Sequence, residues 1–149
     1  MAISRGAGTE IIRSVAHQWV NSTSANLIIG VQHHIYTVLS ITVQCQALQS
    51  TGNYIEIKLT GYDSYLGETA QNINIVKQVM VPGETFVWND KFSFNGYEPT
   101  DFTGAMNGAD DQDAIADQGS SVSQVLKLNG TEGNDKFDVI CTYIDQNNA

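Results

Sequence analysis

The sequence predicts an all-β fold, an antiparallel β-sandwich of jelly-roll type with one long acidic loop, and three observations predict it. Residues 35–45 alternate between the two faces of an extended strand, with β-branched residues recurring at every second position. Several further stretches repeat this period, and Gly, Asn and Pro turn signals separate them. The chain has 149 residues, 42% of them hydrophobic, which is enough for one core without a disulfide or metal staple.

The N-terminal segment differs from the rest of the chain. Residues 1–8 contain glycine and few apolar side chains, so we expect a flexible arm that orders against a partner. The partner-binding candidates in this arm are Met1, Ala2, Ile3, Ser4 and Arg5. Residues 9–149 are expected to form a single sandwich domain.

The first strand is expected at residues 10–20, with Val15, His17 and Trp19 on one face. An amphipathic helix over residues 11–19 is the alternative, because the apolar residues there also fit helical spacing. The polar residues 21–26 predict the turn of a hairpin that leads into a short strand at 27–31.

A long strand is expected at residues 32–47, and the Gly52-Asn53 pair after it predicts a second hairpin turn. The inward residues of this strand are expected to be Ile35, Thr37, Leu39, Ile41, Val43 and Cys45. The hairpin leads into residues 54–60, where Ile55, Ile57 and Leu59 are expected to point inward. A strand over residues 72–81 follows, and its Ile73, Ile75 and Val79 share a phase.

The second half begins with a turn at Pro82-Gly83 and two short strands joined by a tight turn at Asn89-Asp90. Four aromatic residues in these strands predict a wall of the core or of an interface; they are Phe86, Trp88, Phe92 and Phe94. Residues 121–129 and 136–145 are expected to close the chain as a hairpin around residues 130–133. The inward residues of the last strand are expected to be Phe137, Val139, Cys141 and Tyr143.

The segment at residues 98–117 is acidic and glycine-rich, and a loop of this length in a compact domain is usually functional. One or two helical turns over residues 109–118 are an alternative. Its candidate calcium ligands are Asp110, Asp111, Asp113 and Asp117. Their spacing lacks the glycine and the final glutamate of a calcium loop, so a solvated acidic loop or a contact with a basic partner surface competes with calcium binding.

Charge excludes several function classes. The formal net charge is −9 and no basic cluster occurs, so we expect neither nucleic-acid binding nor attraction to an anionic membrane. The first twenty residues contain no continuous apolar run, so neither a secretory signal nor a membrane anchor is expected there. Cys45 and Cys141 are expected to be buried free thiols.

Motifs for catalysis are lacking in the sequence. No phosphate loop, nucleophile elbow or metal-ligand spacing occurs, and His33 and His34 are adjacent on a strand, where they point to opposite faces. We therefore expect a protein that is not an enzyme and has no cofactor. A sugar-binding surface is an alternative, because aromatic side chains with polar edges suit carbohydrate faces. The aromatic candidates are Trp19, Tyr54, Tyr62, Tyr65, Trp88 and Tyr97, of which Tyr62, Tyr65 and Tyr97 are preferred and Trp88 is expected in the core.

Three segments carry a resemblance to a family: Ile-Tyr-Thr-Val at residues 35–38, the Pro-Gly turn and strand pair at 81–92, and the alternating strand at 137–144. Together they resemble small β-sandwich virion structural proteins of tailed bacteriophages, particularly marine ones. The acidic segment at residues 104–119 departs from the common pattern of these proteins, so no role for it follows from the resemblance.

The resemblance implies a non-enzymatic capsid decoration or cement protein that stabilises the head by bridging neighbouring subunits. Its partners would be the major capsid protein or other virion proteins, it would form a homo-oligomer, and it would reside in the virion after synthesis in the host cytoplasm. The alternatives are a neck or tail component, and a carbohydrate-binding or adhesion module.

Overall fold

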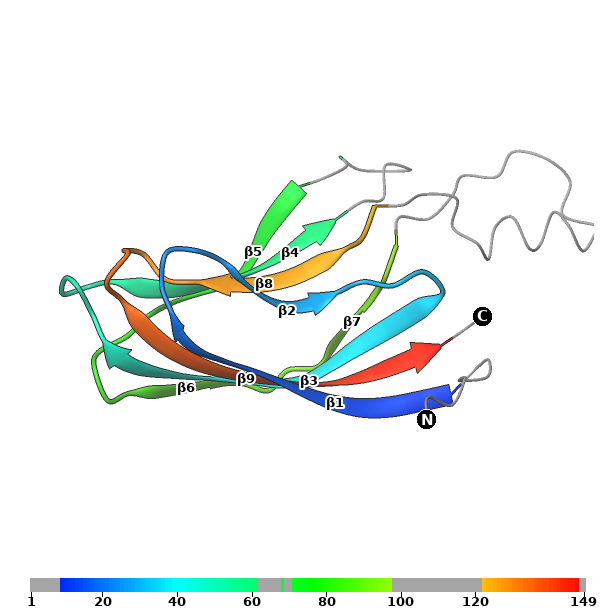
Figure 1. Ribbon diagram of the computed structural model, residues 1–149, viewed down its shortest axis with the longest axis horizontal. Coiled ribbons are helices and arrows are strands. Elements are labelled where there is room, and N and C mark those ends of the chain that lie inside the picture. Colours follow the sequence, from blue (N-terminus) through cyan, green and yellow to red (C-terminus); the bar gives the residue numbers. More distant parts are fainter. Residues whose placement is uncertain (1–8, 62–67, 69–70, 98–121, 148–149) are drawn as a thin grey trace, which may run out of the picture.

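The computed structural model describes residues 9–61, 68, 71–97 and 122–147, and these residues form strands and connections without a helix (Figure 1). The strands are β1 (Thr9–Val20), β2 (Ala25–Ile29), β3 (His34–Ala47), β4 (Tyr54–Gly61), β5 (Gln71–Val79), β6 (Thr85–Trp88), β7 (Phe92–Asn95), β8 (Val125–Asn129) and β9 (Lys136–Asn147). None of the described residues lies in a helix long and apolar enough to cross a membrane.

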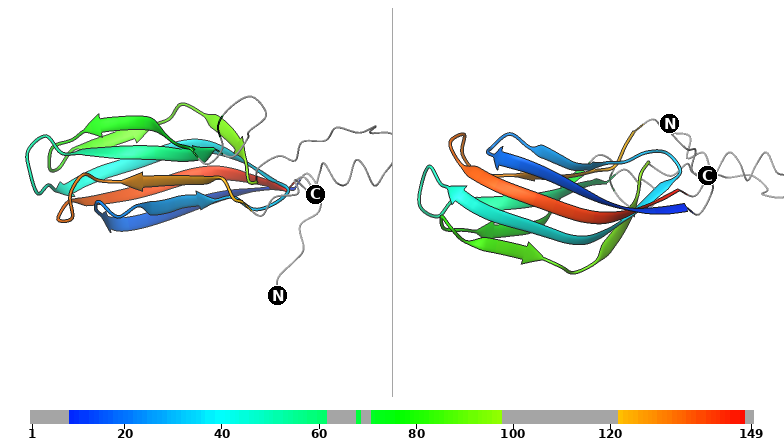
Figure 2. Two further views of the ribbon diagram at one scale, coloured as in Figure 1. Left: turned by 90° about the horizontal axis from the view of Figure 1, so that it is seen from above. Right: turned by 60° about the horizontal axis from the view of Figure 1, so that its bottom comes forward.

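The strands form two antiparallel sheets that pack face to face, which confirms the predicted β-sandwich (Figures 1 and 2). Sheet A has the order β1-β9-β3-β6, with β7 also paired to β3, and sheet B has the order β2-β8-β4-β5. Strands that are consecutive in the chain, such as β1 and β2 or β8 and β9, occupy equivalent positions in the two sheets. This arrangement is the double-sheet jelly roll.

The core lies between the sheets, and the strands supply it from alternate positions. The residues with 0% or 1% exposure include Val38, Ile41, Val43 and Cys45 on β3, Phe137, Val139 and Cys141 on β9, Ile55 and Ile57 on β4, and Leu126 and Leu128 on β8. Each such aliphatic or aromatic side chain contributes roughly 1.5–3 kcal/mol by leaving water.

Three connections predicted as hairpin turns instead cross between the sheets. The residues after β1, β3 and β8 lead into β2, β4 and β9, and each of these pairs of strands is divided between sheet A and sheet B. The β5–β6 connection also crosses, and the register places all four at one end of the sandwich, here called the loop end. The turn predicted at Gly52-Asn53 does form, with a φ of 89° at Gly52. However, a tight turn can connect two strands of one sheet or two strands in different sheets, and here it connects β3 to β4 in the other sheet.

The predicted phase of β3 is half wrong because the strand contains a bulge. Its register against β9 shifts between Val38 and Ser40, so one extra residue reverses the alternation. Ile41, Val43 and Cys45 face inward as predicted. Before the bulge, Tyr36 and Val38 occupy the core in place of Ile35 and Thr37.

The predicted tight turn at Asn89-Asp90 is also wrong. Strands β6 and β7 both pair with β3 in the antiparallel sense, β6 beside Ile41–Gln44 and β7 beside Ile35–Val38, so they are two parts of one edge. The break between them lies opposite the bulge of β3. The aromatic wall is confirmed: Phe94 is buried, and Phe86, Trp88 and Phe92 pack against the core.

Two further strands deviate from simple alternation. Strand β1 forms as predicted, in place of the helical alternative, but its register with β9 shifts between His17 and Val20. Trp19 is therefore 59% exposed, while Val20 is buried. In β5 a register shift beside Ile57 buries Val76 and leaves Ile73 and Val79 more than half exposed.

Candidate functional site

Most of the predicted site residues lie outside the described residues. This holds for the arm candidates Met1, Ala2, Ile3, Ser4 and Arg5, for the aspartates 110, 111, 113 and 117, and for Tyr62 and Tyr65. Tyr97 is described: it is half-buried and forms an isolated bridge with Ser123, and its carbonyl accepts a hydrogen bond from Asn95 Nδ2 at 2.8 Å. The arrangement at Tyr97 is that of a structural residue at the end of β7.

Metal binding has no support within residues 9–61, 71–97 and 122–147, where no group of three His, Cys, Asp or Glu side chains could hold an ion. His33 has a φ of 68° and precedes β3. His34 Nδ1 lies 2.5 Å from Asp145 Oδ1, so its ring is engaged by a carboxylate.

Asp145 is the centre of a polar cluster at the end of the sandwich opposite the loop end. It is 5% exposed on β9, and it contacts His34 on β3 and Arg13 Nε on β1, the latter at 3.2 Å. Tyr36 stacks on His34 and lies edge-on to Tyr143. Burial and the nearby Asp145 carboxylate raise the pKa of Tyr36 to about 12, so its hydroxyl stays protonated. The cluster joins three neighbouring strands and has the character of a structural tie.

A second buried carboxylate, Asp135, organises the loop end. It is 1% exposed, and its Oδ1 accepts hydrogen bonds from Gln49 N and Asn53 Nδ2, both at 2.9 Å. Its Oδ2 accepts from Thr131 N at 3.1 Å and Glu132 N at 2.9 Å. Asp135 therefore holds the β3–β4 connection against the β8–β9 connection.

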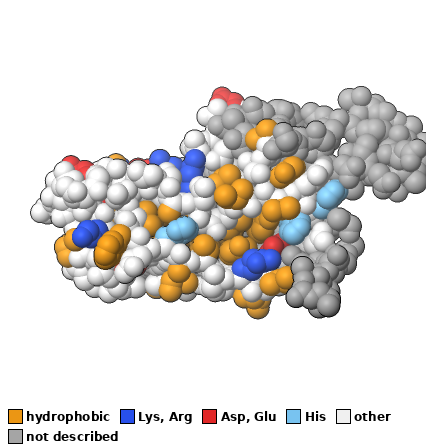
Figure 3. All heavy atoms as spheres, viewed as in Figure 1, with side chains coloured by type: hydrophobic (Ala, Val, Ile, Leu, Met, Phe, Trp, Pro, Cys, Tyr) orange, Lys and Arg blue, Asp and Glu red, His pale blue; other side chains and the backbone are white. Residues whose placement is uncertain are grey.

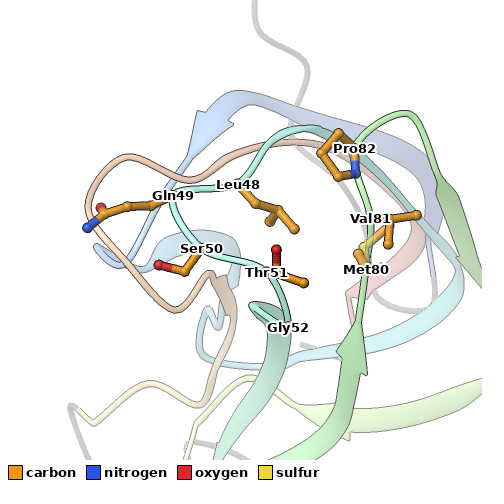
Figure 4. Close-up of a pocket in the computed structure, with 8 residues that line it drawn as sticks. All are labelled: Leu48, Gln49, Ser50, Thr51, Gly52, Met80, Val81 and Pro82. Carbon is orange, nitrogen blue, oxygen red and sulfur yellow. The ribbon is translucent and has the colours of Figure 1, made fainter.

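A shallow cavity of about 230 Å³ lies beside this network (Figure 4). Leu48 and Thr51 border it from the β3–β4 connection, and Met80, Val81 and Pro82 border it from the β5–β6 connection. Its lining contains no charged residue and no nucleophile-base pair, so the cavity offers packing space but no catalytic groups.

The long edge of β1 is a surface on which a strand of another chain could pair. Among the described residues, β1 pairs only with β9, and its other side faces no strand of sheet A. Near the loop end it is tied to β2, where His17 Nε2 donates to the Asn26 carbonyl at 2.8 Å. The open part, residues 10–16 and called the β1 edge here, includes two charged residues, Glu10 and Arg13, and Arg13 already contacts Asp145.

Exposed hydrophobic side chains accompany this edge. Ile12 on β1 is 68% exposed and Ile29 on β2 is 56% exposed, and Figure 3 shows hydrophobic side chains with few charged ones on the side where β1 and β2 lie. The outer face of sheet A continues in the same character, with Ile140 and Val87 exposed and Ser14 within hydrogen-bond distance of Thr142 at 3.2 Å. These surfaces are suited to docking a partner chain.

No protein-family model matches this chain, and a comparison with characterised protein sequences finds no match. Among solved structures, the chain is similar to one from work on Bacillus endospore appendages, which are described as a novel family of disulfide-linked pili. The two are 12% identical, the match covers 100% of this chain and 97% of the other, and the TM-score is 0.42. A likeness this low supports no conclusion about function.

Proposed function

We propose that this chain is a non-catalytic structural subunit of a bacteriophage virion, a decoration protein that stabilises the capsid head by bridging neighbouring subunits. The observation that carries the proposal is the β1 edge, a long strand margin with few charges that pairs with no described strand of its own chain. The kind of particle proposed here, a tailed-bacteriophage virion, is the one that the resemblance of residues 35–38, 81–92 and 137–144 implies.

The physical reason lies in the backbone of an edge strand. Its outward N–H and C=O groups form a template for a strand of another chain, and natural proteins usually block such edges with lysine, proline or bulges. In β1 the bulge comes only after His17, the β1 edge contains no lysine or proline, and its Arg13 contacts Asp145. Pairing along this margin would add main-chain hydrogen bonds, and the exposed Ile12 would add apolar contact area.

The composition is consistent with binding in many copies. Charged residues make up 15% of the chain, which is low for a protein that stays dispersed as a monomer. On a particle, repeated weak contacts combine into strong attachment without large individual affinities. Jelly rolls occur in viral capsid proteins and in lectins, which is an analogy at the level of the fold.

The test places charges on the β1 edge. The double variant Ile12→Lys/Ala16→Lys adds two lysines to exposed positions of β1 and is expected to fold normally. Binding to particles that lack the protein should fall by at least about tenfold. The matched control is Val81→Lys, which adds a lysine to an exposed position in the β5–β6 connection, away from β1, and it should bind as the natural chain does.

The readouts are co-sedimentation with particles from a phage whose gene for this chain is deleted, and the temperature at which those particles release DNA. We expect the natural chain to raise the release temperature and to label the head in electron micrographs. Deleted particles that are as heat-stable as complete ones, or label confined to the tail, would contradict the proposal.

A further inference from the structure

Trp19 has a backbone and an environment that set it apart from the other exposed hydrophobic residues. It has a φ of 60°, a left-handed conformation that is rare for a bulky residue. The bulge between His17 and Val20 turns its side chain outward, where it is 59% exposed. Residues held in such strained conformations cluster at functional sites. They persist only where the surrounding structure fixes them in place.

Asp138 supplies that fixation. Its Oδ1 accepts a hydrogen bond from the Trp19 backbone N–H at 3.0 Å, from a position 119 residues away in the chain. The Lys136 ammonium lies 5.0 Å from the centre of the Trp19 ring and restrains the ring through a cation–π contact. The indole is thus presented to solvent in a fixed orientation.

A row of planar polar groups runs from Asp138 across the outer face of sheet A. Gln46 Nε2 donates to Asp138 Oδ2 at 3.0 Å and to Gln44 Oε1 at 2.8 Å, so the two amides and the carboxylate hold one another in place. Gln44 and Asp138 also border an open cavity of about 370 Å³, a volume at the lower end of the roughly 300–1,000 Å³ of small-molecule sites.

The remaining residues that line this cavity are uncharged: Thr42, Thr85 and Ile140. Asp138 borders the cavity and also accepts the hydrogen bond from the Trp19 backbone N–H, so Trp19 lies next to one wall of the cavity. An exposed flat ring, oriented amide and carboxylate groups, and two hydroxyls are together the groups that recognise a pyranose. Its C–H face stacks on an aromatic ring, and its hydroxyls pair with planar oxygen and nitrogen groups.

We propose that Trp19, Asp138, Gln44 and Thr85 form a binding site for a neutral sugar. Asp138 is the one charged side chain in the cavity lining, so a sialylated, sulfated or phosphorylated ligand would be repelled there, and the Lys136 ammonium lies against the Trp19 ring and not in that lining. The site is independent of the β1 edge, and either proposal can fail without the other. It also differs from the sugar surface that the sequence analysis preferred, Tyr62, Tyr65 and Tyr97, and shares only Trp19 with the wider set of aromatic candidates.

The experiment begins with an array of neutral and anionic glycans probed with the full chain, followed by titration of the best neutral hit. Sugar stacking on Trp19 should change tryptophan fluorescence, because the second tryptophan of the chain, Trp88, packs against the core. Trp19→Ala should weaken binding at least about tenfold and abolish the fluorescence change. Gln44→Ala should weaken binding without removing the fluorescence reporter.

The matched control is Ile73→Ala, which truncates a 58% exposed hydrophobic side chain on β5, in the other sheet. It should leave the dissociation constant unchanged, and thermal melts establish that each variant is folded. Three results would overturn the proposal: no neutral glycan bound, binding restricted to anionic glycans, or neutral binding that Trp19→Ala leaves intact. Loss of particle binding in Trp19→Ala, with no glycan bound by the natural chain, would make Trp19 a protein contact instead.

Discussion

The side-chain carboxylate of Asp135 holds the connections of the loop end together. It accepts four hydrogen bonds from two connections that cross between the sheets. Truncation would leave three backbone N–H groups and the Asn53 amide without this acceptor in a buried site. We therefore expect Asp135→Ala to lower the free energy of unfolding by about 3 kcal/mol, measured by urea denaturation. Asp90→Ala, at an exposed position between β6 and β7, should change it by less than about 0.5 kcal/mol.

The same residue predicts part of the pH dependence of stability. Burial by itself raises the pKa of Asp135, but the hydrogen bonds from Gln49, Asn53, Glu132 and Thr131 outweigh it and hold the pKa below the ordinary 3.8. A lowered folded-state pKa contributes stability that is fully present above pH 3.8 and is lost as the pH falls through the folded value. Asp135→Asn should lose less stability than the natural chain between pH 5 and pH 2, and an equal loss would contradict this assignment.

At the scale of strands, the role of the bulge in β3 in setting which side chains face the core can be tested by deleting one residue. Leu39 is the extra residue between Val38 and Ser40. Its removal would join Tyr36 and Val38 to Ile41 and Val43 in one unbroken alternation, with every buried residue still inward. We expect the Leu39 deletion to give a folded protein with a cooperative thermal transition. Deletion of Thr42, in the same strand, should prevent folding, because it turns buried side chains on one side of it toward solvent.

Circular dichroism melts and amide NMR spectra distinguish these outcomes. An unfolded Leu39 deletion would mean that the bulge is required, for instance because residues 89–91 of the facing edge need the extra length of β3. A folded Thr42 deletion would mean that β3 can bulge elsewhere and restore its phase.

The bulge also explains where prediction from the sequence succeeded and where it failed. The inward residues of β9, from Phe137 to Tyr143, were predicted correctly because β9 keeps one phase throughout that stretch. In β3 both phases offer apolar or β-branched side chains, so Ile35 and Thr37 were as plausible as Tyr36 and Val38. The choice is made by tertiary pairing, which a single strand does not encode.

The candidate sites were less predictable for a related reason. Trp19 belongs to the aromatic set proposed from the sequence, in which the loop tyrosines are preferred. A regular strand would place its ring on the face of Val15 and His17, whereas the bulge leaves it exposed. The support from Asp138 depends on register between strands that are far apart in the chain. The β1 edge likewise becomes visible only when the order of strands in sheet A is known.

At the scale of the whole molecule, the reactivity of the two buried cysteines measures how often the sandwich opens to solvent. Cys141 pairs with Ile41, whereas Cys45 pairs with Phe137, so the two residues are four ladder positions, or roughly 13 Å, apart on adjacent strands. A disulfide requires Cα atoms within about 7 Å. Both thiols are buried and free, as the sequence predicted. Burial raises the pKa of Cys141 to about 12 and also raises that of Cys45.

These positions predict that neither thiol reacts until the sandwich opens. At pH 8 both remain protonated, and only the thiolate attacks a disulfide reagent, so labelling of the native protein should proceed at the rate set by global unfolding. We expect no labelling with Ellman's reagent on the timescale in which the chain in guanidinium loses both thiols. Ser24→Cys, an exposed position between β1 and β2, should label at once and serves as the control. Rapid native labelling of Cys45 alone would show that the loop end opens locally, which would make the Asp135 network, and not the core, the weakest part of the molecule.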